Sequence, residues 1–203
     1  MLAAPQVWVV AANMTSRKKP GRRGSERMSD FSFRGMEFLF KVIDFVYPYI
    51  DKRVQRFGIR PGMTVVDYGC GPGRYTTRFA HLVEDRGRVF AVDIHELAIE
   101  GVEKRIKKQG LKTVTPVLAK GYDSGIPDGV ADIVCAIDMF FAINDPTAFL
   151  KEIRRITDPE GFLVIDDGHQ SRKKTKRKIA ASGCWEVTEE SKDHLKCKPL
   201  SVA

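Results

Sequence analysis

A stretch with three alternating glycines, VVDYGCGPGRYT over 65–76, holds the residue types best suited to ligand chemistry in this chain. Two β-branched residues lead into Asp67, and the glycines follow it. Glycine accepts positive φ and lets a ligand lie against bare backbone. A helix is expected to start near Arg74, and its first N–H groups would point at that ligand. The order of strand, glycine turn and helix therefore predicts a pocket for part of a nucleotide-like ligand.

The charges around these glycines indicate which kind of nucleotide-like ligand fits. The run departs from the G-x-G-x-x-G dinucleotide pattern, and no G-x-x-x-x-G-K-[ST] sequence for a triphosphate follows it. Asp67 lies just before the first glycine, where a carboxylate would repel a pyrophosphate and attract an ammonium group. We therefore expect a zwitterionic ligand that carries a nucleoside.

A second acidic residue, Asp93, ends the next predicted strand within RVFAVDIH, residues 88–95. A carboxylate at the end of the second strand of such a fold accepts hydrogen bonds from ribose hydroxyls. A glycine loop alone is weak evidence, whereas the loop followed by a suitably spaced acid is much more specific. The two features together favour a nucleoside ligand.

These residues resemble the signature of the class I S-adenosylmethionine-dependent methyltransferases. The matching residues are the run from Asp67 to Gly73 and the pair Val92-Asp93, and IPDGVADIVCAID over 126–138 is similar to the same family's approach to its fourth strand. The resemblance implies S-adenosyl-L-methionine as cofactor, S-adenosyl-L-homocysteine as product, and methyl transfer by in-line displacement. It points to a small-molecule acceptor, as in the branch that serves ubiquinone and menaquinone biosynthesis.

The resemblance also assigns roles to individual residues. Asp67 would orient the glycine loop with the methionine ammonium nearby, Asp93 would hold the ribose diol, and Ile94 would pack on the adenine. The residues expected to contact the cofactor are Asp67, Gly69, Cys70, Gly71, Gly73, Tyr75, Asp93, Ile94, Lys120, Gly121, Asp138 and Met139.

The loop after the third strand departs from the family pattern, which brings an Asp or Asn side chain to the adenine amino group. Lys120 and Gly121 stand at that point here, and lysine cannot accept a hydrogen bond. The adenine contact would then use backbone groups, or Asp123 after a small shift.

The segment after the fourth strand holds two candidate catalytic groups. Related enzymes often carry a histidine pair here, but this chain has Phe141 and Ala142, which predicts an apolar wall. Asp138 could orient an acceptor or bind the methionine ammonium, and His169 could serve as a base or lie in solvent. Because the sulfonium methyl is already activated, a base is needed only if the acceptor must lose a proton. No metal site is predicted.

The elements that must position these residues alternate between strands and helices, which predicts a parallel sheet covered on both sides. Alternating apolar residues around Trp185 and Leu195 predict a closing antiparallel hairpin. The resemblance implies an α/β, Rossmann-like, doubly wound sheet of seven strands in the order 3-2-1-4-5-7-6, with strand 7 antiparallel. Strands are expected at about 63–68, 88–93, 114–119, 132–138 and 161–167, and helices at about 74–84, 95–109, 146–157 and 171–182.

The N-terminal region differs in composition from the rest of the chain. Residues 1–30 are rich in Arg, Lys, Gly and Ser, and we expect them to form a disordered basic tail. Residues 31–203 are expected to form one methyltransferase domain. Within it, residues 31–57 would supply N-terminal cap helices over the ligand.

Size and composition fit one ordinary globular domain. The chain has 203 residues, of which 43% are hydrophobic and 30% charged. No apolar run approaches the roughly 18–20 residues that a membrane span needs. The four cysteines form no C-x-x-C pair, which disfavours a zinc site or a disulfide framework and favours a cytoplasmic location.

The net charge of +8 is concentrated in two basic runs, at 17–27 and 172–178, and the remaining sequence is slightly acidic. Such runs can contact phosphates, although they are more often a tail and a solvated helix face. Two alternatives to a small-molecule enzyme therefore stay open. One is an RNA or protein methyltransferase guided by 172–178, and the other is a non-catalytic subunit that binds S-adenosylmethionine.

Overall fold

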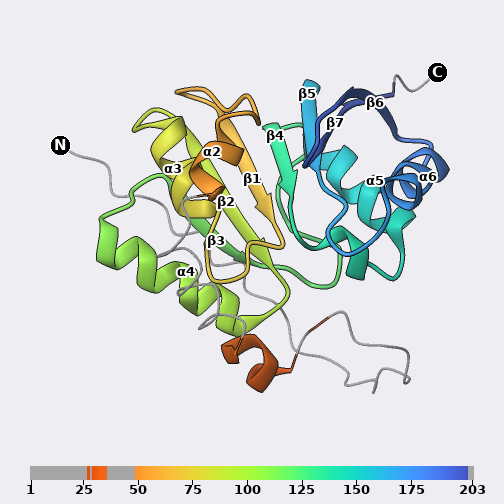
Figure 1. The fold of residues 1–203 in the computed structure, drawn as a ribbon. Helices are drawn as coiled ribbons and strands as arrows, with labels where there is room; N and C mark the ends of the chain where they lie inside the picture. The colour runs from red at the N-terminus through yellow and green to blue at the C-terminus, as the bar shows by residue number, and fades with distance from the viewer. Residues whose placement is uncertain (1–26, 28, 36–48, 201–203) are drawn as a thin grey trace.

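A seven-stranded sheet forms the centre of the computed structural model, which describes residues 27, 29–35 and 49–200 (Figure 1). The strands are β1 (Thr64–Tyr68), β2 (Arg88–Asp93), β3 (Val114–Leu118), β4 (Ala131–Ala136), β5 (Thr157–Ile165), β6 (Trp185–Glu190) and β7 (Leu195–Pro199). Their order is β3-β2-β1-β4-β5-β7-β6, and β7 runs antiparallel to both of its neighbours. This order confirms the predicted Rossmann-like topology.

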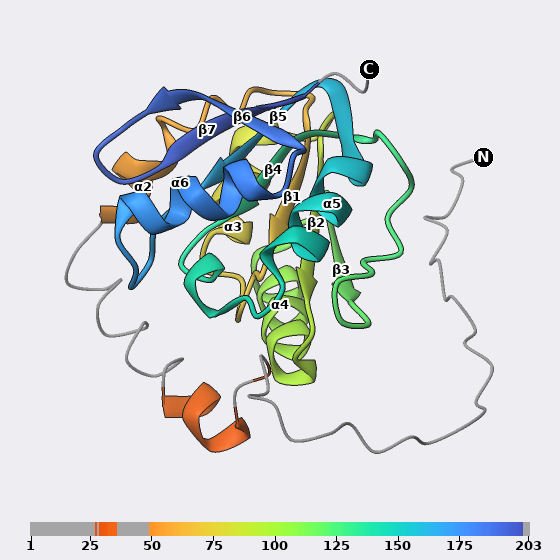
Figure 2. The same cartoon turned by 90° about the vertical axis from the view of Figure 1, so that its right-hand side faces the viewer.

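Helices cover both faces of the sheet (Figures 1 and 2). They are α2 (Tyr49–Val54), α3 (Thr76–Val83), α4 (Glu96–Gln109), α5 (Pro146–Ile156) and α6 (Arg172–Ala181), with a short 3-10 helix η1 (Phe140–Ala142). Successive residues of a strand point to opposite faces. Val65 of β1 accordingly packs in the core beneath α2, α3 and α4, whereas Val66 packs in the core beneath α5 and α6.

The parallel strands bring their carboxyl ends to one edge of the sheet. Tyr68 of β1 lies beside Val92 of β2, and Asp67 lies beside Cys135 of β4. The chain leaves β1 toward one face of the sheet and leaves β4 toward the other, and ligands of open α/β sheets bind outside the strand ends at such a switch point. The segments after β1, β2 and β4 are therefore placed around one opening.

The β6–β7 hairpin extends the sheet beyond β5. Ile165 of β5 lies opposite Leu195 of β7. The amide of Ser191 donates to the carbonyl of His194 at 2.9 Å and closes the hairpin turn. This register places the turn beside the residues that follow β5.

Two element ends differ from the sequence predictions. β5 begins at Thr157 because this residue already pairs with Ala131 of β4. Gly161 makes the close approach possible, since a Cβ there would lie 2.8 Å from the Ala131 carbonyl oxygen. Helix α3 begins at Thr76 because the glycine turn continues to that point.

The expected basic tail, 1–30, falls almost entirely outside the described residues. Of the expected cap helices at 31–57, the described parts are helical at 30–35 and in α2. The domain boundary therefore stays a prediction. No helix in the described part of the chain is long and apolar enough to cross a membrane.

Candidate functional site

A cavity opens at the carboxyl ends of β1, β2 and β4. The glycine loop after β1, the end of β2, the loop after β3 and the segment after β4 line it. The structure brings nine of the predicted cofactor residues to its wall: Gly69, Cys70, Gly71, Tyr75, Asp93, Ile94, Gly121, Asp138 and Met139. The other three, Asp67, Gly73 and Lys120, lie outside the wall formed by the described residues.

The glycine loop presents backbone to the cavity. Gly71 has a φ of 51°, and a Cβ added to it would meet nothing within 4 Å. Gly69 has a φ of 77°, and a Cβ there would lie 2.9 Å from Cγ of Met139. Gly73 serves a packing role instead, because its missing Cβ leaves room for Val102 of α4, 3.2 Å away. The loop thus offers a ligand open backbone at Gly71.

Asp93 holds the glycine loop against the start of α4. Its Oδ2 accepts a hydrogen bond from the Gly71 amide, and its Oδ1 accepts one from the His95 amide, each at 2.9 Å. Burial raises the pKa of Asp93, and these backbone donors oppose the rise. A carboxylate oxygen can accept more than one hydrogen bond. Both oxygens therefore retain capacity for a ligand.

Asp67 lies beneath the loop and faces the protein interior. It is 2% exposed, and the Thr76 hydroxyl donates a hydrogen bond to its Oδ2. Burial raises the pKa of Asp67 to about 7. In this position Asp67 fixes the start of α3 relative to the glycine loop, rather than reaching the cavity itself.

Asp138 is a cavity-lining carboxylate held by several elements. Its φ is 60°, a left-handed conformation that residues other than glycine rarely adopt. The Asp138 amide donates to Oδ1 of Asp166 at 3.0 Å, and the Tyr75 hydroxyl donates to Oδ2 of Asp138 at 3.2 Å. The Arg53 guanidinium lies 3.4 Å from the other carboxylate oxygen. The side chain is nevertheless 45% exposed, so a ligand can reach it.

The wall after β4 is apolar, as its sequence predicted. Met139, Phe141 and Ile143 line the cavity on this side. His169 is exposed and lies outside the described cavity wall, with its ring edge-on to Phe141 at a centroid distance of 4.7 Å. The two candidate catalytic groups therefore differ in position. Asp138 lines the cavity, whereas His169 contacts Phe141, which lines it.

The loop after β3 reaches the cavity through Gly121 and Tyr122. Lys120 is exposed, and its backbone pairs with that of Asp123. The Asp123 carboxylate accepts a hydrogen bond from the Gly125 amide at 2.9 Å. The described wall thus contains Gly121 and Tyr122 of this loop, and neither Lys120 nor Asp123.

An N-terminal segment covers the side of the cavity at the end of β2. The Phe33 ring is 3% exposed and lies 4.5 Å from the His95 ring, centroid to centroid. Arg27 forms an ion pair of 2.7 Å with Glu96 in the first turn of α4. Both Arg27 and Phe33 line the cavity. These contacts dock the segment over the part of the wall that contains Asp93.

Sequence reasoning missed several residues that build this site. Tyr68 and Tyr122 line the cavity, and their positions inside the glycine motif and next to Gly121 were available signals. Phe33 and Arg53 carry no comparable local signal. Arg53 meets Asp166 across 113 residues of sequence, a proximity that only the folded chain reveals.

The chain matches the family model described as a methyltransferase domain over residues 59–197. It is 29% identical over 123 residues to the ubiquinone/menaquinone biosynthesis C-methyltransferase of Shewanella oneidensis, covering 60% of this chain and 49% of that protein. The protein of the same name from Shewanella frigidimarina is 30% identical over 121 residues, with coverage of 59% and 48%. The chain thus spans about half the length of the curated relatives it matches.

Solved structures show the same relationship. A SAM-dependent methyltransferase from Aquifex aeolicus superimposes with a TM-score of 0.65 at 25% identity, covering 73% of this chain and 87% of that one. A SAM-dependent O-methyltransferase from Thermotoga maritima shares the fold, with a TM-score of 0.61 at 17% identity and coverage of 77% and 67%. The family match, the curated relatives and the fold agree, and the chain therefore belongs to the class I S-adenosylmethionine-dependent methyltransferases.

Proposed function

We propose that this protein binds S-adenosyl-L-methionine in the cavity and transfers its methyl group to a small, largely apolar acceptor. The observation that carries the proposal is that one cavity contains Asp93, at the end of β2, and Asp138, just after β4, with β2 and β4 on either side of β1. The open backbone of Gly71 lines the same cavity. This arrangement suits a ligand with a ribose at one end and an ammonium group at the other.

The polar groups of the wall fit an adenosyl amino acid. Each oxygen of Asp93 accepts one backbone hydrogen bond, and the remaining lone pairs suit the two hydroxyls of a ribose. Asp138 supplies a negative charge for an ammonium group. Ile94 and Tyr122 add apolar surface on which a purine can pack.

When bound, S-adenosyl-L-methionine supplies a methyl group that a sulfonium centre has already activated. The protein's own task is then to hold an acceptor in line with that group, and such positioning contributes much of the rate of two-reactant steps. The apolar wall of Met139 and Phe141 favours an acceptor with an apolar body. Asp138 stands where it can orient an acceptor hydroxyl or take up a proton.

The wall and the relatives support the same acceptor class. The curated relatives are named for ubiquinone and menaquinone biosynthesis, which favours a quinol-like aromatic acceptor here. Those relatives are C-methyltransferases, whereas the Thermotoga protein is an O-methyltransferase. An acceptor screen should therefore offer both ring carbons and phenolic oxygens.

Calorimetric titration with S-adenosyl-L-homocysteine tests the cofactor site. The wild-type protein should bind it, and Asp93→Ala should weaken binding roughly 100-fold, because the ribose loses its acceptor and the glycine loop loses its anchor. Asp85→Ala is the control, since Asp85 is exposed and lies outside the described cavity wall. A folded wild-type protein that does not bind the ligand would contradict the proposal.

Turnover is tested separately, with methyl-labelled S-adenosyl-L-methionine and a panel of quinol-like and small amine metabolites. The expected result is label transfer to a quinol-like member of the panel. Binding without transfer to any member would instead favour a non-catalytic subunit.

A further inference from the structure

A buried arginine of α2 stands behind Asp138. Arg53 is 5% exposed. Its guanidinium donates to the Tyr75 hydroxyl at 2.7 Å and to Oδ2 of Asp166 at 2.6 Å, and it lies 3.4 Å from Oδ1 of Asp138. Burial alone would lower the pKa of Arg53, but Tyr75 and the carboxylates outweigh this effect and raise it. The guanidinium therefore stays charged.

Asp138 needs support because its backbone is in an unfavourable conformation. A residue other than glycine keeps a positive φ only where its surroundings hold it there. The Asp166 carboxylate binds the Asp138 amide, and the Tyr75 hydroxyl binds the Asp138 carboxylate. Arg53 contacts both of these partners and Asp138 itself. Arg53 therefore contacts both side chains that hold Asp138, as well as Asp138 itself.

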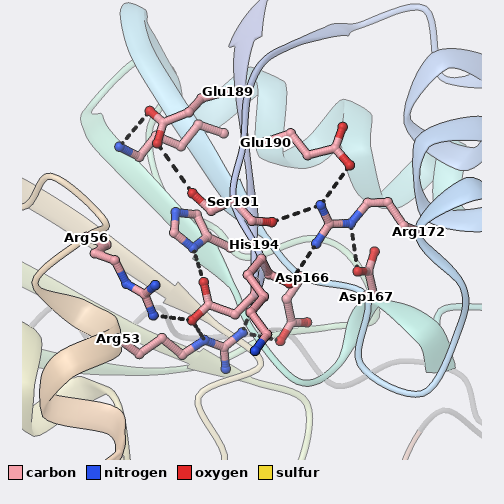
Figure 3. A network of polar contacts seen from close by, with 12 residues as sticks. Arg53, Arg56, Asp166, Asp167, Arg172, Glu189, Glu190, Ser191 and His194 are labelled. Carbon is pink, nitrogen blue, oxygen red and sulfur yellow. Dashed lines mark hydrogen bonds and ion pairs between the residues drawn. The ribbon is translucent and has the colours of Figure 1, made fainter.

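The β6–β7 hairpin fixes Arg53 from the other side (Figure 3). The carbonyl oxygen of Asp193, in the hairpin turn, accepts a hydrogen bond from Arg53 at 2.9 Å. The Asp193 carboxylate lies 3.9 Å from Nε of Arg53. Arg172 of α6 holds the turn from the opposite direction by donating to the Ser191 carbonyl at 3.0 Å. The Arg53 guanidinium is therefore held on two sides and cannot easily turn away.

We propose that Arg53 is a positioning residue of the cofactor site, which holds the Asp138 carboxylate toward the ammonium group of the cofactor's methionine moiety. This inference rests on the proposed function, because it requires the cofactor to occupy this cavity. It makes α2 and the hairpin contributors to cofactor binding, although no residue of either element is in the described cavity wall.

A purely stabilising role explains this arrangement less well. Buried ion pairs are weak evidence for stability, because desolvation opposes their attraction. Burial and the neighbouring Asp138 raise the pKa of Asp166, and Arg53 opposes that rise. The positive charge of Arg53 lies beside both carboxylates and offsets the repulsion between them. An ionised Asp138 is the form that attracts an ammonium group.

Two ligands that share the adenosine part separate positioning from structural support. S-adenosyl-L-homocysteine carries the amino-acid group, and methylthioadenosine lacks it. Calorimetry should show that Arg53→Gln binds S-adenosyl-L-homocysteine roughly tenfold more weakly or worse, while its affinity for methylthioadenosine changes by less than about twofold. If the role of Arg53 were merely structural, the variant would bind both ligands more weakly and to the same extent.

Further variants complete the test. Arg56→Gln is the matched control, because Arg56 is half exposed and pairs with Asp193 without contacting Asp138, so neither affinity should change. Tyr75→Phe removes one hydroxyl from Asp138 and should give a smaller loss that is again confined to S-adenosyl-L-homocysteine. If Arg53→Gln does not fold, Arg53→Lys decides the question by the same two affinities, because it keeps the positive charge but cannot make the same set of hydrogen bonds.

The outcomes distinguish the inference from the function on which it rests. A wild-type protein that binds neither ligand overturns both. A wild-type protein that binds both ligands, with variants that lose them equally or not at all, overturns the role of Arg53 and leaves the cofactor site intact.

Discussion

The two sides of the cavity are built by different means. On the β1–β2 side, backbone groups dominate, and the Gly71 amide meets Asp93 across 22 residues of sequence. On the β4–β5 side, buried charged side chains hold the cavity-lining Asp138 in place. Arg53 reaches Asp138 across 85 residues and Asp166 across 113. The expected ribose end is thus a local structure, whereas the expected ammonium end is assembled from distant parts of the chain.

This difference has a consequence for how each side responds to change. A local turn held by backbone hydrogen bonds can be altered at one position with limited effect elsewhere. A buried network shares its partners, so the loss of one member leaves the others with unpaired charge. Removal of a charged partner on the β4–β5 side should therefore cost more global stability than a change on the β1–β2 side.

Removal of Asp166 should give the largest effect on stability. Asp166→Ala leaves Arg53 buried without its shortest ion pair, and the free energy of unfolding should fall by about 3–5 kcal/mol. The neighbouring Asp167→Ala is the control. Asp167 is partly exposed and its partner Arg172 keeps Glu190, so the loss should stay below about 1 kcal/mol. Denaturant unfolding measures both, and equal losses would show that the buried network contributes no more than a partly exposed ion pair.

Gly69→Ala should give the next largest effect. The variant combines a φ of 77° with a contact of 2.9 Å to Met139, and we expect it to destabilise the protein by about 2–3 kcal/mol. Gly110→Ala shares the positive φ but meets open space, so its cost should be about 1 kcal/mol. Of the two variants, only Gly69→Ala should also bind S-adenosyl-L-homocysteine more weakly in calorimetry. A similar loss of affinity in Gly110→Ala would show that backbone strain far from the cavity is enough to weaken ligand binding.

Asp67 predicts a pH dependence for the β1–β2 side. Its pKa is raised from 3.8 to about 7 in the folded protein. The stability it contributes is fully present below about pH 4 and is lost as the pH rises through about 7. Between about pH 5 and pH 8 the wild type should therefore lose roughly 2–3 kcal/mol relative to Asp67→Asn. The Asn side chain can still accept from Thr76. Parallel pH profiles of the two proteins would refute this account of Asp67.

The exposed face of α6 should show the smallest effect. Lys173, Lys174 and Arg177 are exposed and lie outside the described cavity wall. Their simultaneous replacement by Gln should leave the affinity for S-adenosyl-L-homocysteine within about twofold, and the wild type should show no salt-sensitive RNA binding. Salt-sensitive binding that the triple variant loses would instead revive the RNA methyltransferase alternative.

Much of the fold was predictable because the central strands are buried on both faces and give short apolar runs such as TVVDY and ADIVCA. The glycine loop and Asp93 were predictable because each is marked by residues that lie close together in the sequence. Other features depend on which way a side chain turns in the fold. Asp67 points inward. Gly121 and Tyr122 line the cavity where Lys120 was also expected.

Arg53 shows most clearly what sequence patterns miss. In the sequence it is one basic residue of a short helix, YIDKRV, and nothing nearby marks it as buried. Its partners come from the start of α3, the end of β4, the end of β5 and the β6–β7 turn. Only the strand order, which brings these four points together, explains why a charge is buried there.

A crystal structure of the protein with S-adenosyl-L-homocysteine tests the central claim most directly. The ribose hydroxyls should meet Asp93 and the ammonium group should meet Asp138, with Arg53 still paired behind it. A ligand bound with its ribose away from Asp93, or with its ammonium group held by other residues while Asp138 turns aside, would contradict the account.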